Sequence, residues 1–286
     1  MLKRQRTGSV LCTSCGVLVG VNDASCYNCG RRNPGLWGWA PAVRSLGGDL
    51  GFTPFIIGAC SAIYVFSYAL TLALGGQFGG MMAPSSRVLD YLGWSGSAPV
   101  FDQGRWYTLL TAGWLHGSVL HIGFNMLGVW QLLPSIVELY GAGRTVIIYT
   151  LAGVAGFFLS SVIDFLLPGL PFLGARATVG ASAAIFGLIG AAAYYGRRTG
   201  SRLASSQAWS YAISMGVYSF LLGGGMVDNA AHIGGFAGGY FAGRLLDPLK
   251  PERIDHLVMA GICLLVSVGA IGTRIIMAII AVMRQQ

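Results

Sequence analysis

The chain has 286 residues, of which 54% are hydrophobic and only 10% are charged, and its net charge is +8. Soluble globular domains carry about 25% charged residues, so this composition excludes an ordinary soluble protein and favours a membrane protein in a lipid bilayer. The basic residues follow the connections between apolar segments, so their excess indicates membrane topology, and we expect no nucleic-acid partner.

The first 35 residues contain two Cys-x2-Cys pairs, Cys12 with Cys15 and Cys26 with Cys29. Four thiolates at such spacing are typical of a closed tetrahedral zinc site, which is structural rather than catalytic. Two disulfides are the alternative, and the cytoplasmic location expected for this segment argues against them. The sequence therefore predicts a zinc-ribbon-like head over residues 1–35, which offers a site for a cytoplasmic partner, and a linker over 36–51.

Seven apolar segments follow the head. A helix that spans a bilayer needs about 17–25 residues, and each segment is close to or above that length. They cover residues 55–74, 106–133, 145–163, 179–195, 209–226, 230–246 and 257–283. The sequence therefore predicts an all-α, multi-pass membrane protein.

The basic residues orient the predicted helices. If the amino terminus is cytoplasmic, most of them lie on the cytoplasmic side, which is the positive-inside pattern. The cytoplasmic set is Lys3, Arg4, Arg6, Arg31, Arg32, Arg44, Arg144, Arg197, Arg198, Arg202, Arg244, Lys250 and Arg253, and the outer set is Arg87, Arg105, Arg176 and Arg284. The carboxyl terminus is then extracytoplasmic. Arg274, near the outer end of the last helix, is expected to reach the lipid headgroups.

A long outer loop is predicted between the first two apolar segments, over residues 75–105. It is rich in Gly, Ser and Pro, and it also carries large apolar side chains such as Tyr91 and Trp94. This mixture suits a loop that lies in the membrane interface. Loops of such length are often functional when they are ordered. A flexible connector is the alternative.

Ser182 and His232 are polar residues inside the fourth and sixth apolar segments, where polar groups are costly and point to function. Each is surrounded by small residues at three- and four-residue steps, which let membrane helices approach closely. These residues are Gly180, Ala183, Gly187 and Gly190 in one segment, and Ala231, Gly235, Gly238, Gly239 and Ala242 in the other. The pattern predicts that His232 lies within hydrogen-bonding distance of Ser182 as a general base for a nucleophile. The alternatives are a packing serine and a histidine that only joins two helices.

His121 and Asn125 lie four residues apart in the second apolar segment and share one helix face. Both side chains can donate hydrogen bonds. Together with the backbone N–H of Ser182 they could form an oxyanion hole, the donor cluster that acyl transfer requires. The alternative is a polar patch that joins the second helix to its neighbours. His116 is offset from this face and is expected to brace the outer loop.

These residues resemble the rhomboid family of intramembrane serine proteases, over residues 52–247. The shared patterns are His116-x4-His121-x3-Asn125, Gly180-x-Ser182 and Ala231-His232-x2-Gly235-x3-Gly239. The resemblance implies that Ser182 is the nucleophile, His232 the base, and His121 and Asn125 the oxyanion donors. It also implies that Gly180 lets the backbone crowd the site and that the Phe186 ring lies against the histidine. No catalytic cofactor is then needed, and the substrates are transmembrane segments of other proteins.

The resemblance implies a six-helix core over residues 52–247, followed by a cytoplasmic loop and an extra seventh helix over 248–286. A bacterial inner membrane is the expected location. Two residues depart from the family pattern: Ala183 replaces the usual glycine after the serine, and Tyr107 replaces the arginine that usually follows Trp106. A rhomboid-like chaperone or binding protein without proteolytic activity is the alternative. A transporter is disfavoured because no internal repeat is visible.

Overall fold

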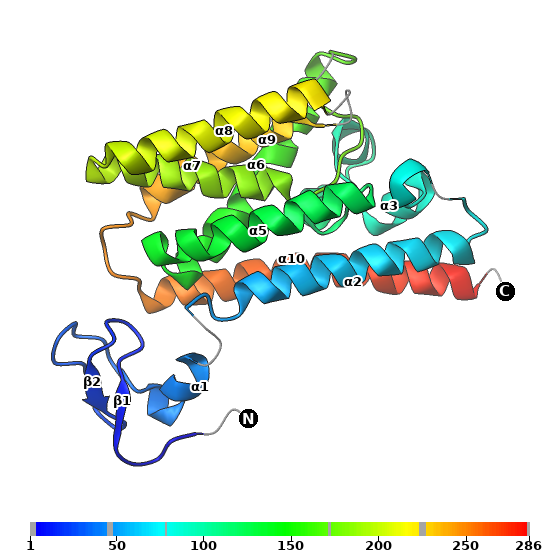
Figure 1. The fold of residues 1–286 in the computed structure, drawn as a ribbon. Helices are drawn as coiled ribbons and strands as arrows, with labels where there is room; N and C mark the ends of the chain where they lie inside the picture. The colour runs from blue at the N-terminus through cyan, green and yellow to red at the C-terminus, as the bar shows by residue number, and fades with distance from the viewer. Residues whose placement is uncertain (1–3, 45–47, 78, 171–172, 223–226, 285–286) are drawn as a thin grey trace.

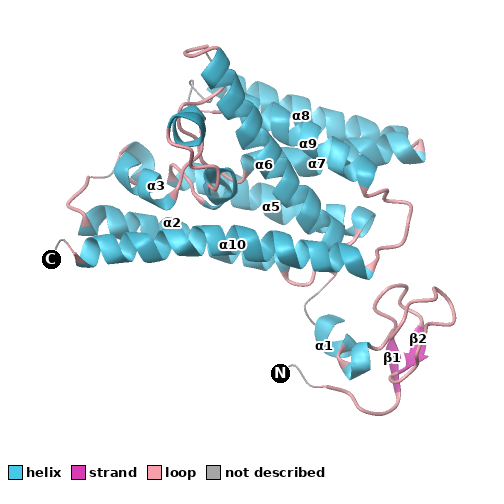
Figure 2. Ribbon diagram, turned by 180° about the vertical axis from the view of Figure 1, so that it is seen from behind, coloured by secondary structure: helices cyan, strands magenta, loops and turns pink. Residues whose placement is uncertain are grey.

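The computed structural model describes residues 4–44, 48–77, 79–170, 173–222 and 227–284. It consists of a small head near the amino terminus and a bundle of long helices (Figure 1). Within these ranges one two-stranded sheet is present, in the head, and the rest of the regular structure is helical (Figure 2). Lys3, from the predicted cytoplasmic set, and Met226, the predicted end of the fifth span, lie outside the described residues.

The head is built on strand β1 (Ser9–Leu11), which pairs antiparallel with β2 (Leu18–Gly20). A 3-10 turn, η1 (Leu36–Gly38), and a short helix, α1 (Ala40–Arg44), follow. Ala40 belongs to the small core of the head, and the Gln5 N–H donates to the Gly38 carbonyl over 2.9 Å. Residues 36–44, which the sequence assigned to a linker, therefore pack on the head. The predicted domain boundaries stay a proposal.

Long helices make up the bundle, and each overlaps one predicted apolar segment. They are α2 (Phe52–Ala73), α5 (Val119–Tyr140), α6 (Ala142–Leu166), α7 (Ser182–Thr199), α8 (Arg202–Leu222), α9 (Asn229–Leu245) and α10 (Ile254–Met283). In the described part of the chain, α2, α5, α6 and α10 are long and apolar enough to cross a membrane. This mostly helical bundle is the expected fold class, an all-α multi-pass membrane protein, and the number of crossings stays a prediction.

The predicted second span was wrong at both ends. The sequence placed it over residues 106–133, whereas α5 begins at Val119 and ends at Tyr140. The hydroxyl of Ser118 caps the helix by accepting from the His121 N–H, and the preceding apolar residues form the short helices α4 (Thr108–Thr111) and η4 (Ala112–Trp114). Hydropathy could not separate these elements because the apolar run continues across both.

Helices α7 and α9 approach each other until their backbones touch. A Cβ atom at Gly235 would lie 2.0 Å from the Ala183 carbonyl oxygen, and one at Gly239 would lie 1.9 Å from the Gly187 carbonyl oxygen. Neither distance is compatible with a side chain, so these positions require glycine. The predicted close contact between the two small-residue segments is confirmed.

The loop over residues 75–105 is folded rather than a flexible connector. It contains η2 (Gly80–Met82), α3 (Ser86–Leu92) and a π turn, η3 (Ala98–Asp102). The Ser97 hydroxyl donates to the Asp164 carboxylate at the end of α6, and Ser95 pairs with Thr178 through two backbone hydrogen bonds of 2.9 and 2.6 Å. These contacts attach the loop to the segment that leads into α7.

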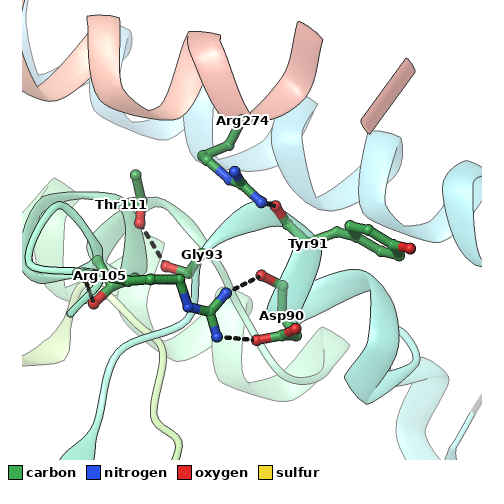
Figure 3. A network of polar contacts seen from close by, with 7 residues as sticks. Asp90, Tyr91, Gly93, Arg105, Thr111 and Arg274 are labelled. Atoms are coloured by element: carbon green, nitrogen blue, oxygen red, sulfur yellow. Dashed lines mark hydrogen bonds and ion pairs between the residues drawn. The ribbon is translucent and has the colours of Figure 1, made fainter. Parts of the chain in front are cut away.

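Arg274 does not reach out to headgroups as predicted. Its guanidinium donates twice to the Tyr91 carbonyl oxygen, over 2.8 and 2.6 Å (Figure 3). It also lies 5.4 Å from the centre of the Tyr107 ring. The prediction failed because the loop folds over this part of α10 and offers the guanidinium a nearer acceptor.

Candidate active site

Ser182 and His232 lie side by side at one end of the bundle. Ser182 is the first residue of α7, and His232 lies in the first turn of α9. The His232 Nε2 atom is 2.9 Å from the Ser182 Oγ atom, a hydrogen-bonding distance. The glycine contacts between α7 and α9 make this distance attainable. The hydroxyl is thus paired with the imidazole of another helix, as the sequence predicted.

Phe186 holds the imidazole ring in place. It follows Ser182 by one helical turn and stacks on His232, with 4.2 Å between ring centres and 13° between ring planes. A ring stacked on one face restricts rotation of the imidazole about its own axis. His232 therefore presents the ring edge that carries Nε2 to the Ser182 hydroxyl.

Hydrogen-bond donors from α5 face the backbone just before Ser182. Gly180 has φ +127°, and a Cβ atom there would lie 2.5 Å from His121 Nε2 and 3.6 Å from Asn125 Nδ2. The short distance to the His121 ring and the positive φ both require glycine at this position, whereas the Asn125 amide lies at an ordinary contact distance. The structure therefore brings together Gly180, His121, Asn125 and Ser182, the set that the sequence singled out.

The hydrogen bonds of His121 indicate which ring nitrogen carries the proton. Its Nδ1 atom accepts from the Gly117 N–H over 3.3 Å, so in the neutral ring the proton lies on Nε2, which faces Gly180. The Asn125 amide uses one N–H on the His121 carbonyl, over 3.0 Å, and keeps a second one. Two donors are thus available beside the Ser182 backbone.

Asp228 caps α9 and does not orient the histidine ring. One carboxylate oxygen accepts from the Ala231 N–H over 3.0 Å, and the other accepts from the Ser160 hydroxyl over 2.5 Å. This confirms the expected helix cap. The second ring nitrogen of His232, Nδ1, is buried and has no hydrogen-bond partner among the residues that the structure describes.

His116 lies nearer to the donor cluster than the sequence suggested. It was expected to brace the outer loop, but it is fully buried and meets the His121 ring edge-on, with 5.2 Å between ring centres. The sequence placed His116 away from the face of His121 by assuming helical spacing between them. His116 precedes α5, so that spacing does not apply to it. The spacing of the two histidines alone could not reveal the contact.

A sequence model described as the rhomboid domain matches residues 103–248, slightly more than half of the chain. The chain belongs to the rhomboid family. It is an integral membrane protein, as the family and the apolar helices together indicate.

Several rhomboid proteins are similar to this chain. Rhomboid protease GluP of Bacillus subtilis is 31% identical over 170 residues, 57% of this chain and 30% of that protein. RHOMBOID-like protein 7 of Arabidopsis thaliana is 33% identical over 177 residues, 58% of this chain and 51% of that protein. Rhomboid-like protease 5 of Toxoplasma gondii is 28% identical over 165 residues, 56% of this chain and 18% of that protein. The chain thus spans about half or less of the length of these relatives.

The two departures from the rhomboid pattern are accommodated locally. The Ala183 methyl group lies where α6 presents Gly156, whose own Cβ atom would be 2.7 Å from it, so a glycine on the partner helix makes the room. Near the missing arginine, Arg105 instead pairs with the Asp90 carboxylate over 2.5 Å and anchors α3 (Figure 3). The extra methyl group of Ala183 is therefore accommodated between α7 and α6.

The four cysteines of the head lie outside the matched rhomboid region and gather at one point. Their sulfur atoms all lie within 4.8 Å of one another, with 3.8 Å between Cys12 and Cys29 and 3.6 Å between Cys15 and Cys26. Sulfurs held tetrahedrally at about 2.3 Å from zinc are about 3.8 Å apart, so the arrangement fits the ion. Disulfides would need about 2.05 Å, and all four thiols are free.

The two exposed cysteines of the cluster differ in acidity. A hydrogen bond from the Val17 backbone N–H lowers the pKa of the Cys15 thiol to about 6, whereas partial desolvation of the sulfur raises the pKa of the Cys29 thiol to about 11. Close sulfurs cannot all carry negative charge unless a cation balances them. The glycines after each pair, Gly16 and Gly30, adopt positive φ, and their N–H groups donate to the carbonyls of Cys12 and Cys26.

Proposed function

We propose that this protein is an intramembrane serine endopeptidase that cleaves transmembrane segments of other membrane proteins. The observation that carries the proposal is the 2.9 Å separation of Ser182 Oγ and His232 Nε2 where α7 and α9 begin. Two of the similar proteins, a rhomboid protease and a rhomboid-like protease, carry names that support the same activity.

In the proposed reaction, Ser182 Oγ attacks the carbonyl carbon of the scissile peptide bond while His232 Nε2 takes the hydroxyl proton. The oxygen of the tetrahedral intermediate gains negative charge, which the His121 and Asn125 side chains and the Ser182 backbone N–H stabilise. The C–N bond then breaks, and His232 gives its proton to the departing amine. Water, deprotonated by the same histidine, hydrolyses the acyl-enzyme and frees Ser182.

The substrate must present an extended segment, because peptide bonds inside a helix are shielded. We propose that it enters beside α8, between Trp209 and Leu222. The described outer side of α8 carries exposed apolar side chains at Trp209, Ile213 and Val217, as expected of a helix that faces lipid. Helix α8 packs mainly against α7. It also contacts α9 through the rings of Trp209 and Phe236, whose centres are 5.0 Å apart.

The proposal is tested with purified protein in liposomes that also contain a designed transmembrane substrate. We expect cleavage within the substrate helix near the membrane face and labelling of Ser182 by a fluorophosphonate probe. A protein that folds and binds the substrate, yet is never labelled in any lipid composition, is instead the non-proteolytic chaperone or binding protein.

The proposed oxyanion donors give a separate prediction. Asn125→Ala is expected to lower kcat by about 10²–10³-fold with little change in KM, because the lost donor acts only on the charge of the transition state. His121→Phe should have a similar effect, since it keeps a ring but removes the Nε2 proton. Gln131→Ala, at an exposed position of the same helix, is the control and should leave kcat unchanged. Wild-type kcat in both donor variants would exclude this role.

For the head, we propose that Cys12, Cys15, Cys26 and Cys29 hold one structural zinc ion. Cys26→Ser is expected to lower the zinc content from about one ion per chain towards zero and to speed trypsin cleavage after Arg31 and Arg32, because such a small core depends on the metal. Cys263→Ser, in α10, is the matched control and should keep the metal. Full zinc content in the Cys26 variant, measured by elemental analysis, would contradict the assignment.

The charge pattern supports a cytoplasmic amino terminus and an extracytoplasmic carboxyl terminus, which places Ser182 near the outer face of the membrane. The head then lies in the cytoplasm, where a protein partner could bind it. We propose a bacterial inner membrane as the location. Accessibility of a cysteine added near each terminus to an impermeant reagent in intact cells tests this orientation.

A further inference from the structure

Helix α10 lies outside the matched rhomboid region, which ends at residue 248. Its side chains nevertheless form hydrogen bonds with a segment that packs beside the candidate active site. Its Arg274 guanidinium donates twice to the Tyr91 carbonyl (Figure 3). The same guanidinium lies over the Tyr107 ring. Two turns earlier on the same helix face, Ser267 accepts a hydrogen bond of 2.9 Å from the Trp114 indole N–H. Both partners of this second bond are buried.

Tyr91, Tyr107 and Trp114 belong to one stretch of chain, residues 91–114, which we call the bridging segment. The Thr111 hydroxyl donates to the Gly93 carbonyl over 2.5 Å and ties its two ends together (Figure 3). Arg274 and Ser267 thus contact both ends of a segment that is itself closed by a hydrogen bond. Removal of the Ser267 hydroxyl would leave the buried Trp114 N–H unpaired, which is costly in an apolar setting. Removal of Arg274 would take both guanidinium hydrogen bonds from the half-buried Tyr91 backbone.

The bridging segment is bonded in turn to the backbone that leads into Ser182. Ser95 exchanges two backbone hydrogen bonds with Thr178, and the Ala112 carbonyl accepts from the Gly180 N–H over 3.0 Å. A cavity of about 40 Å³, lined in part by Trp114, Gly180, Leu264 and Ser267, lies between α10 and this backbone. A shift of the bridging segment towards α10 or away from it would therefore displace Gly180, which faces the donors of His121 and Asn125.

We propose that α10 is a positioning element of the active site, with Arg274 and Ser267 as positioning residues. They hold the bridging segment, and the bridging segment holds Gly180 and Ser182 in place against the donor cluster. The inference rests on the proposed protease function. Its physical basis is that catalysis depends on geometry within a fraction of an ångström, so a small displacement lowers kcat while the substrate still binds.

The test compares Arg274→Gln, Arg274→Lys and Ser267→Ala in liposomes with the designed substrate. Arg274→Gln is expected to lower kcat by about tenfold, within the range that small misplacements cost, with KM within about twofold of wild type. Arg274→Lys keeps the charge and one donor, so it should restore part of the rate. Arg284→Gln, at the exposed arginine that follows the last residue of α10, is the matched control and should change neither constant.

A second measurement does not depend on proteolytic activity. Trypsin added to the folded, detergent-solubilised variants should cut after Arg105 faster in Arg274→Gln and Ser267→Ala than in wild type or Arg284→Gln. If Arg274→Gln does not fold, the inference is tested on Ser267→Ala alone, by its kcat and by its rate of trypsin cleavage after Arg105.

Wild-type kcat in the folded Arg274 and Ser267 variants would overturn the inference, even if trypsin cut faster, because α10 would then hold the segment without positioning the site. If the wild-type protein cleaves no substrate at all, the proposed function fails first. The trypsin result then still shows whether α10 holds the bridging segment, so the two failures can be told apart.

Discussion

Replacement of Ser182 by alanine is expected to abolish cleavage of a transmembrane substrate, with a loss in kcat on the order of 10⁶-fold, as in soluble serine proteases. The reason is chemical: the Ser182 hydroxyl lies 2.9 Å from a histidine nitrogen, and alanine removes the atom that would form the acyl-enzyme. His232→Ala should be nearly as damaging, because an unassisted hydroxyl is a poor nucleophile at neutral pH. The double variant should be no worse than either single one, since the two groups act as a unit.

Matched controls separate this effect from a general loss of structure. Ser206→Ala removes an exposed hydroxyl of α8 that bonds back to Leu203, and His256→Gln removes a histidine in the first turn of α10. Both should keep the wild-type rate. Substrate cleavage and fluorophosphonate labelling are measured on proteins with the same thermal midpoint. Cleavage at the wild-type rate by the Ser182 or the His232 variant would remove the proposed mechanism.

Gly239→Ala is expected to destabilise the protein and to suppress cleavage, although it adds a single methyl group. The new Cβ atom would lie 1.9 Å from the Gly187 carbonyl oxygen, a backbone atom that cannot rotate away. Helices α7 and α9 must then separate, which lengthens the contact between Ser182 and His232 as well. Overpacking usually costs about 1–3 kcal/mol, and a clash of two backbones belongs at the upper end of that range.

The control for this prediction is Gly261→Ala in α10, where the described structure has no atom within 4 Å of the added Cβ. In a helix, alanine is favoured over glycine by about 1 kcal/mol, so this variant should be neutral or slightly more stable. Thermal unfolding in detergent and the rate of Ser182 labelling are compared for both variants. A Gly239→Ala protein as stable and as reactive as wild type would show that the two helices are not held in backbone contact.

The positions of most helices could be predicted from hydropathy, because a bilayer-spanning helix leaves a long apolar run in the sequence. The second span shows where this fails. Its apolar run begins at Trp106, but the helix begins at Val119, after a serine that caps it. The loop over residues 75–105 was equally ambiguous, because its order depends on bonds to Asp164, Thr178 and Arg274, which are distant in the sequence.

The residue types of the candidate site and their spacing along each helix follow from the sequence alone. So does the close approach of α7 and α9, since only small residues at regular steps permit it. Tertiary structure decided the rest. The 13° stacking of Phe186 on His232, the direction of His121 Nε2 towards Gly180 and the burial of His116 against His121 all join separate parts of the chain.

Composition and periodicity determined that this chain is a helical membrane protein with a serine and a histidine in two glycine-lined helices, because those properties are local. The packing of the whole bundle decided two further contacts. Gly156 lies against the Ala183 methyl group, and Arg274 donates hydrogen bonds to the loop over residues 75–105. Such contacts depend on which atoms meet across helices, and a single sequence holds no distance between residues that are far apart along it.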